Sequence, residues 1–218
     1  MQLINTMYLS LALIIGASSW KLLEPTLAQN GTAVISSMSS DNQNGSKPIS
    51  IKLPDNLTKK QFEMLNFAYD VAKSDGFKEP KYLQGLIMQE SKAGGMSSFR
   101  VAGLTNAVGN RYFGIGQIKL QAAKAVMNRF PDMWKHLDTK TDEELQARLI
   151  VDDKFNVRVA SKYALIMGIN ENPTKALTAY NVGPGGVLTV DTTTHPYTQK
   201  VKGYAEKFAK SSQKFAMF

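Results

Sequence analysis

Residues 81–92 are KYLQGLIMQESK, and their pattern predicts a helix with an acid on its apolar face. Leu83, Ile87 and Glu90 share one helical stripe, which should face the core. Desolvation raises the pKa of a carboxyl group, so an acid placed there can hold a proton near neutral pH and donate it. The alternative is an acid near the helix end that turns towards solvent, and the helix alone leaves both interpretations open.

The composition indicates a globular domain with attachments. The chain has 218 residues, of which 43% are hydrophobic, enough to bury a sizeable core. The formal net charge is +8, and the first fifty residues balance two lysines against two acids, so the excess lies in the remainder. A basic body suits an anionic partner such as nucleic acid, a membrane surface or an acidic cell-wall polymer. The absence of cysteine excludes disulfides, thiolate metal sites and a Cys nucleophile.

The N-terminal region has the features of an export signal. Residues 7–18, MYLSLALIIGAS, are apolar but short for a membrane span, and small residues near Ala28 provide a cleavage site. We therefore expect residues 1–28 to be a signal peptide or an uncleaved N-terminal membrane anchor, and a periplasmic or secreted protein. A buried helix is the third possibility. Residues 29–56 are rich in Ser, Asn and Gly and are predicted to be a flexible linker.

Residues 57–218 are predicted to be the folded, mostly helical domain. Thr58 and Gln61 have capping-box spacing at the start of a first helix, which precedes the helix of Glu90. Residues 93–113 are rich in Gly and Asn and show no period, which is typical of a functional or mobile loop. After residues 114–117 a helix is expected to run to about Phe130 and to stop at Pro131.

The C-terminal part of this domain continues the helical pattern. One long helix is predicted from Thr141, where Glu144 completes a second capping box, to about Gly168. Asn172 is expected to cap a short helix that ends at the Gly-Pro-Gly-Gly of residues 183–186, and a last amphipathic helix begins at Pro196. Because no strand shows sustained alternation, the expected fold class is all-α, or mainly α with a minor β element.

The residue inventory favours acid–base chemistry by a single carboxylate. Neither histidine lies in a nucleophile pattern, so a Ser-His hydrolase is disfavoured. No His-Glu-x-x-His run or Asp-rich loop predicts a metal, and neither a metal nor another cofactor is expected. Basic residues alternate with acids along the helices, so we expect no nucleic acid partner. Glycoside cleavage needs a proton donor for the leaving oxygen, and Glu90 has a suitable position.

Four separated segments resemble the motifs of one family, the lytic transglycosylases of the soluble, goose-type-lysozyme-like (SLT) group. They are Glu90-Ser91, residues 114–118 (GIGQI), residues 153–163 (DKFNVRVASKY) and residues 176–185 (ALTAYNVGPG). The four occur in the order of the family's motifs, and the resemblance covers roughly residues 57–208. Gly116 departs from the family's Gly-Leu-Met-Gln-Ile motif, in which a Met occupies that position.

The resemblance implies a lysozyme-like helical domain with a saccharide-binding groove. It implies that Glu90 protonates the glycosidic oxygen between N-acetylmuramic acid and N-acetylglucosamine, and then acts as base on the muramic 6-hydroxyl. The product would carry a 1,6-anhydromuramoyl end, and no water would be consumed. The substrate-binding residues implied are Ser91, Gln117, Tyr180 and Asn181, with Tyr180 also holding the orientation of Glu90.

Several functions remain open at this point. The leading expectation is a peptidoglycan lytic transglycosylase, a lyase of the bacterial cell wall whose partner is the glycan strand. A lysozyme-type hydrolase would use the same Glu90 with water. A non-catalytic peptidoglycan-binding module could serve an envelope-spanning secretion, conjugation or phage assembly. A basic helical protein that binds nucleic acid is the remaining class, and its binding would be strongly salt-dependent.

Overall fold

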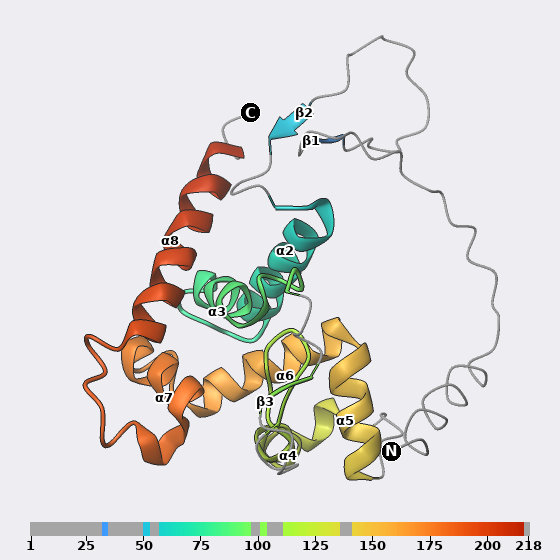
Figure 1. Cartoon of the computed structure of the whole chain (residues 1–218), viewed down its shortest axis with the longest axis vertical. Coiled ribbons are helices and arrows are strands. Elements are labelled where there is room, and N and C mark those ends of the chain that lie inside the picture. Colours follow the sequence, from blue (N-terminus) through green and yellow to red (C-terminus); the bar gives the residue numbers. More distant parts are fainter. Residues whose placement is uncertain are drawn as a thin grey trace, which may run out of the picture. The chain divides into compact units, whose positions relative to one another are not determined.

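The computed structural model describes residues 32–34, 50–52, 57–96, 101–103, 111–135 and 141–215, and this part of the chain is mainly α-helical, as predicted (Figure 1). The elements are α2 (Lys59–Ser74), α3 (Lys81–Ser91), α4 (Leu120–Arg129), the 3-10 helix η4 (Pro131–Met133), α5 (Asp142–Val151), α6 (Asp153–Ile166), α7 (Pro173–Gly186) and α8 (Pro196–Phe215). Within these ranges no helix combines the length and the apolar character that crossing a membrane requires.

The N-terminal predictions lie largely outside the described residues. Residues 1–28, predicted as signal or anchor, are not among them. Within the predicted linker two short strands are described, β1 (Thr32–Val34) and β2 (Ser50–Lys52), and they pair antiparallel with Ala33 opposite Ile51. The predicted linker therefore contains a paired element that its Ser- and Asn-rich composition did not indicate.

Both predicted capping boxes are confirmed. At the start of α2 the Gln61 backbone N–H donates to the Thr58 hydroxyl over 3.2 Å, and the Thr58 N–H donates to the Gln61 side chain over 2.9 Å. At the start of α5, Thr141 and Glu144 exchange the same pair of bonds. These bonds satisfy backbone donors that have no partner inside the helix, which is why the sequence signature located both starts.

The prediction of a single long helix from Thr141 to about Gly168 is wrong, because the helical conformation is interrupted at Asp152. This residue has extended backbone angles (φ −102°, ψ 92°) and its carboxylate accepts the Phe155 N–H over 2.9 Å. Asp152 is thus the N-cap of α6, a role that Asp favours. The apolar period crosses the break because α5 and α6 both bury their apolar residues in the same core.

The loop before α4 contains a second pair of short strands. Strand β3 (Val101–Gly103) pairs antiparallel with β4 (Arg111–Phe113), with Ala102 opposite Tyr112. Phe113 also forms an isolated bridge with Ile118, which closes residues 114–117 into a tight turn. This turn carries the GIGQI segment to the interior face of α6.

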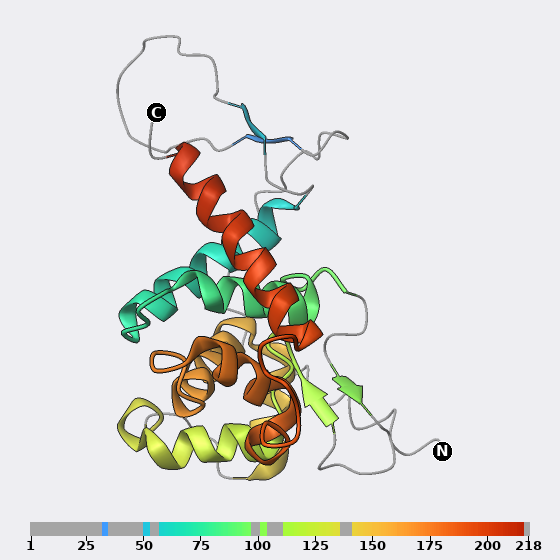
Figure 2. The ribbon, with the colours of Figure 1, turned by 90° about the vertical axis from the view of Figure 1, so that its left-hand side faces the viewer.

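Helix α3 is the centre of the helical core. Its residues Leu83, Leu86 and Ile87 are at most 1% exposed, and the helix packs most extensively against α8 (Figure 2). The contact is a close backbone approach: a Cβ added to Gly85 would lie 2.3 Å from the Val201 carbonyl oxygen of α8. This approach brings the C-terminal end of α3 towards the first turn of α8.

Candidate functional site

Glu90 lies in the last turn of α3, and its carboxylate is largely withdrawn from solvent. It accepts a hydrogen bond from the hydroxyl of Tyr197, which belongs to the first turn of α8. Burial raises the pKa of Glu90 from 4.5 to about 7, and the Tyr197 hydrogen bond, which favours the charged form, offsets part of that rise. The predicted acid on the core-facing stripe is therefore a group whose pKa lies near neutral pH.

Two buried tyrosines adjoin this carboxyl group. Burial, followed by the negative charge of Glu90, raises the pKa values of Tyr180 and Tyr197 well above the ordinary value. The Tyr180 hydroxyl donates to the Gly116 carbonyl over 2.8 Å, and its ring meets that of Tyr163 edge-on at 5.4 Å. Tyr180 is thus near Glu90, but the hydrogen bond that orients Glu90 comes from Tyr197, not from Tyr180 as predicted.

Gly116 occupies a position without room for a side chain. A Cβ there would lie 2.9 Å from both the Ala160 Cβ and the Asn156 Oδ1 atom. The Gly116 N–H donates to that Oδ1 atom over 2.7 Å, while its carbonyl accepts from Tyr180. On this backbone a Met side chain, which the motif of the resembled family has at this position, would collide with α6. The close approach of α6 therefore requires the Gly at position 116.

Asn156 on α6 holds the GIGQI turn in place. Its side-chain nitrogen donates to the carbonyl oxygens of Phe113 and Leu149, over 2.8 and 2.9 Å, and its oxygen accepts from Gly116. The residue is fully buried, so these three bonds replace those that water would make. Sequence reasoning recognised Asn156 only as part of a motif and did not assign it this positioning role.

Three predicted residues border one small pocket. Gln117, Tyr180 and Asn181 line it together with Tyr112 and Tyr163. Asn181 is exposed, and the Gln117 side chain donates to the Gly114 carbonyl over 2.8 Å while its residue remains partly open to solvent. The pocket thus combines amide groups with aromatic rings, a combination suited to a polar ligand with apolar faces such as a sugar.

Ser91 has a different setting from the one predicted. The residue is 0% exposed, its hydroxyl donates to the Ile87 carbonyl over 3.3 Å and accepts from the Gly94 N–H over 3.1 Å. The predicted contact between Ser91 and substrate is not supported by this buried position. Ser91 instead stabilises the turn that follows Glu90.

Unusual backbone angles gather around the site. Within the described ranges three non-glycine residues have positive φ: Lys92 (54°), Ala93 (53°) and Gln117 (50°). Two of them lie two and three residues after Glu90, and the third lines the small pocket. Such conformations are costly and cluster at functional sites, where surrounding contacts hold them. Here the Gln61 side chain donates to the Lys92 carbonyl over 2.7 Å.

Tyr197 is the residue of the candidate site that the sequence did not indicate. Nothing in its spacing indicates Glu90, which is 107 positions away. The available signal is its place in the first turn after Pro196, where a helix end can meet another helix end.

The arrangement supplies one proton donor close to Tyr180, which lines a polar pocket. A carboxyl group with a pKa of about 7 can act as general acid and then as base near neutral pH. In the part of the chain that the structure describes, no cluster of His, Asp or Glu could hold a metal ion. No family model, curated protein or solved structure matches the chain significantly.

Proposed function

We propose that the chain is a peptidoglycan lytic transglycosylase with a lysozyme-like helical domain, whose saccharide groove passes Glu90. The observation that carries the proposal is the carboxyl group of Glu90, with its pKa of about 7, at the end of α3 near the pocket of Gln117, Tyr180 and Asn181. The order of the four sequence motifs supports the same assignment.

The proposed reaction uses Glu90 twice. The protonated carboxyl group donates its proton to the glycosidic oxygen as the bond from the muramic C1 atom to that oxygen breaks. The resulting carboxylate then takes the proton of the muramic 6-hydroxyl, whose oxygen bonds to C1 and closes the 1,6-anhydro ring. Glu90 ends as it began, and no water is added. The Tyr197 hydroxyl stabilises the carboxylate between the two steps, because it donates a hydrogen bond to it.

The surroundings of the substrate follow from the same proposal. Gln117 and Asn181 would contact the glycan, with Tyr180 forming the wall beneath it. The net charge of +8 suits a wall polymer whose peptides carry carboxylates. Such a substrate places the protein outside the cytoplasmic membrane, as a periplasmic or secreted enzyme that opens the wall for a secretion, conjugation or phage system.

The decisive experiment is mass spectrometry of purified peptidoglycan incubated with the protein. The wild-type chain should release anhydromuropeptides, and Glu90→Gln should release none because the amide cannot donate the proton. The matched control is Glu63→Gln on the exposed face of α2, which should leave turnover unchanged.

Each other outcome identifies a different function. Muropeptides with reducing ends would keep Glu90 as the acid but make the protein a lysozyme-type hydrolase. Wall binding without release by either protein would make it a binding module. Turnover that survives in Glu90→Gln would refute the assignment of the acid.

A further inference from the structure

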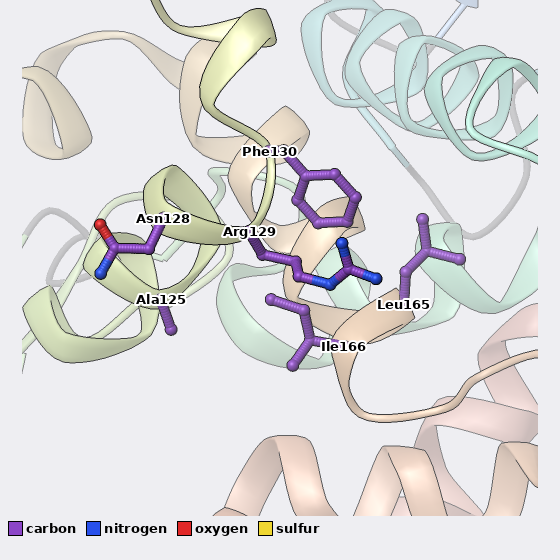
Figure 3. A pocket seen from close by; sticks show the side chains of 6 residues that line it. All are labelled: Ala125, Asn128, Arg129, Phe130, Leu165 and Ile166. Atoms are coloured by element: carbon purple, nitrogen blue, oxygen red, sulfur yellow. The ribbon is translucent and has the colours of Figure 1, made fainter.

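A larger groove lies between α4 and α6, beside the pocket already described. It has a volume of about 700 Å³ and its wall is formed by Ala125, Asn128, Arg129, Phe130, Leu165 and Ile166 (Figure 3). This volume lies in the range of sites that hold small ligands or short peptide segments. No step of the proposed reaction uses it.

The groove lies along the same two helices, α4 and α6, as the small pocket of Gln117, Tyr180 and Asn181, which is called the glycan pocket below. Ala122 of α4 and Tyr163 of α6 border the pocket, and Ala125 and Ile166, three residues further along each helix, border the groove. Residues three apart are neighbours on one helical face. From Ala122 to Arg129 the rise along α4 is about 10 Å, at about 1.5 Å per residue.

Arg129 is the charged residue of the groove. Its guanidinium lies 5.8 Å from the centre of the Phe130 ring, and Figure 3 shows the side chain reaching past Phe130 and Ile166 towards Leu165. None of the six residues that form the wall is acidic, and Arg129 forms no ion pair with the described residues. A guanidinium binds a carboxylate through two parallel N–H···O bonds, so an anionic partner fits here.

The remaining wall selects among anionic partners. Ala125, Leu165 and Ile166 present aliphatic surface, and Asn128 adds one amide. A free phosphate or a bare sugar acid would leave the aliphatic surface unused. A short peptide that carries small apolar side chains and a carboxylate would use both the aliphatic wall and Arg129.

We infer that this groove binds the stem peptide of peptidoglycan, with a stem carboxylate on Arg129, while the glycan lies at Gln117 and Asn181. The inference rests on the proposed function. An extended peptide spans about 3.4 Å per residue, so about three residues cover the 10 Å from the glycan pocket to Arg129. The acidic residue recognised is therefore close to the third position of the stem.

The test measures binding by the full chain carrying Glu90→Gln, so that the ligand is not cleaved. Three fluorescent probes are compared: a peptide-free glycan tetrasaccharide, the same glycan with stem peptides, and the same with every stem carboxylate amidated. The stem-bearing probe should bind about tenfold more tightly than the other two, the size expected for one charge-assisted contact.

Substitutions on α4 assign this preference to Arg129. Adding Arg129→Gln should abolish the tenfold preference. Arg129→Lys keeps the charge but cannot form the two parallel hydrogen bonds of a guanidinium, so it should retain a part of the preference. The matched control is Lys124→Gln, which removes the same charge from an exposed position of α4 that is paired with Asp142. It should leave the preference intact.

The failure of this inference differs from failure of the proposed function. Equal binding of the three probes, or a preference that survives Arg129→Gln, overturns the peptide groove while glycan binding stands. If no probe binds and the wild type releases no anhydromuropeptides, the proposed function falls and the inference falls with it.

Discussion

A carboxylic acid keeps its proton at neutral pH only where water is scarce, and the last turn of α3 provides such a place for Glu90. The cost is a carboxylate that is poorly solvated once it forms. Tyr197 reduces that cost by one hydrogen bond without removing it, which leaves the pKa of Glu90 at about 7. A pKa near the working pH is the value at which one group serves best as acid and base in turn.

The pKa of Glu90 predicts how stability depends on pH. The folded chain holds this proton up to about pH 7, whereas the unfolded chain loses it near 4.5, so the folded state binds more protons in that window. The free energy of unfolding therefore falls as pH rises from 4.5 to 7 and stays low above it. The free energy of unfolding of Glu90→Gln, relative to that of the wild type, should therefore increase by about 3 kcal/mol between pH 4 and pH 8.

Urea unfolding at pH 4, 6 and 8 measures this difference. Glu63→Gln, at a side chain that is 61% exposed, provides the control and should follow the wild type at every pH. If the difference in unfolding free energy between Glu90→Gln and wild type is the same at all three pH values, the pKa of Glu90 is not raised by burial.

Tyr197→Phe tests the hydrogen bond to Glu90 directly. Removing a donor to the carboxylate disfavours its charged form, so the pKa of Glu90 should rise and the alkaline limb of the pH–activity profile should move to higher pH. Tyr69→Phe, at an exposed tyrosine of α2, should leave the limb in place. A limb that moves to lower pH would show that Tyr197 does not donate to Glu90.

At the scale of elements, the site depends on how closely α3 and α8 approach. Glu90 comes from the end of the first helix and Tyr197 from the start of the second, and Gly85 permits their backbones to meet. The GIGQI turn reaches the same place because Asn156 of α6 binds the Phe113 carbonyl just before the turn and the Gly116 N–H within it. The site is thus assembled by contacts between elements and not by any one of them.

Gly85→Ala should separate α3 from α8. The added Cβ would lie 2.3 Å from the Val201 carbonyl oxygen, so a helix must move, at a cost of about 1–3 kcal/mol of unfolding free energy. Activity should fall by more than stability explains, because the movement shifts Glu90 relative to Tyr197. Urea unfolding and muropeptide release measure the two effects.

The matched control lies on α8 itself. Gly203→Ala meets no atom within 4 Å and should stabilise the chain by up to about 1 kcal/mol through helix propensity. If Gly85→Ala were as harmless as Gly203→Ala, the close approach of the two helices would not constrain the site.

At the scale of the whole molecule, the positive charge should act on wall binding. The excess of eight positive charges lies after residue 50, in the region that also contains the site. Attraction between exposed charges is screened over about 10 Å at 0.1 M salt. Binding of the Glu90→Gln chain to purified walls should therefore weaken as salt rises from 50 to 500 mM.

Walls whose stem carboxylates have been amidated separate charge from shape in the same binding measurement. Binding to these amidated walls, which lack the stem carboxylates, should change little with salt. Wall binding that is independent of salt would show that the basic surface plays no part in it.

The sequence by itself determined the helical class, both capping boxes and the acid at the end of α3, because these follow from contacts within a few residues. It merged α5 and α6 into one helix, because an apolar period that continues through both helices concealed the cap at Asp152. It also placed Ser91 at the substrate, although the residue is buried in a turn.

Only the tertiary structure decided which group holds Glu90 and which groups surround it. Tyr197 reaches Glu90 across 107 residues, and Asn156 reaches Gly116 across 40, so no local pattern connects either pair. The raised pKa of Glu90 has the same origin, because desolvation is a property of everything packed around a carboxyl group. Local periodicity can propose that an acid faces the core, but only the packed helices determine what it meets there.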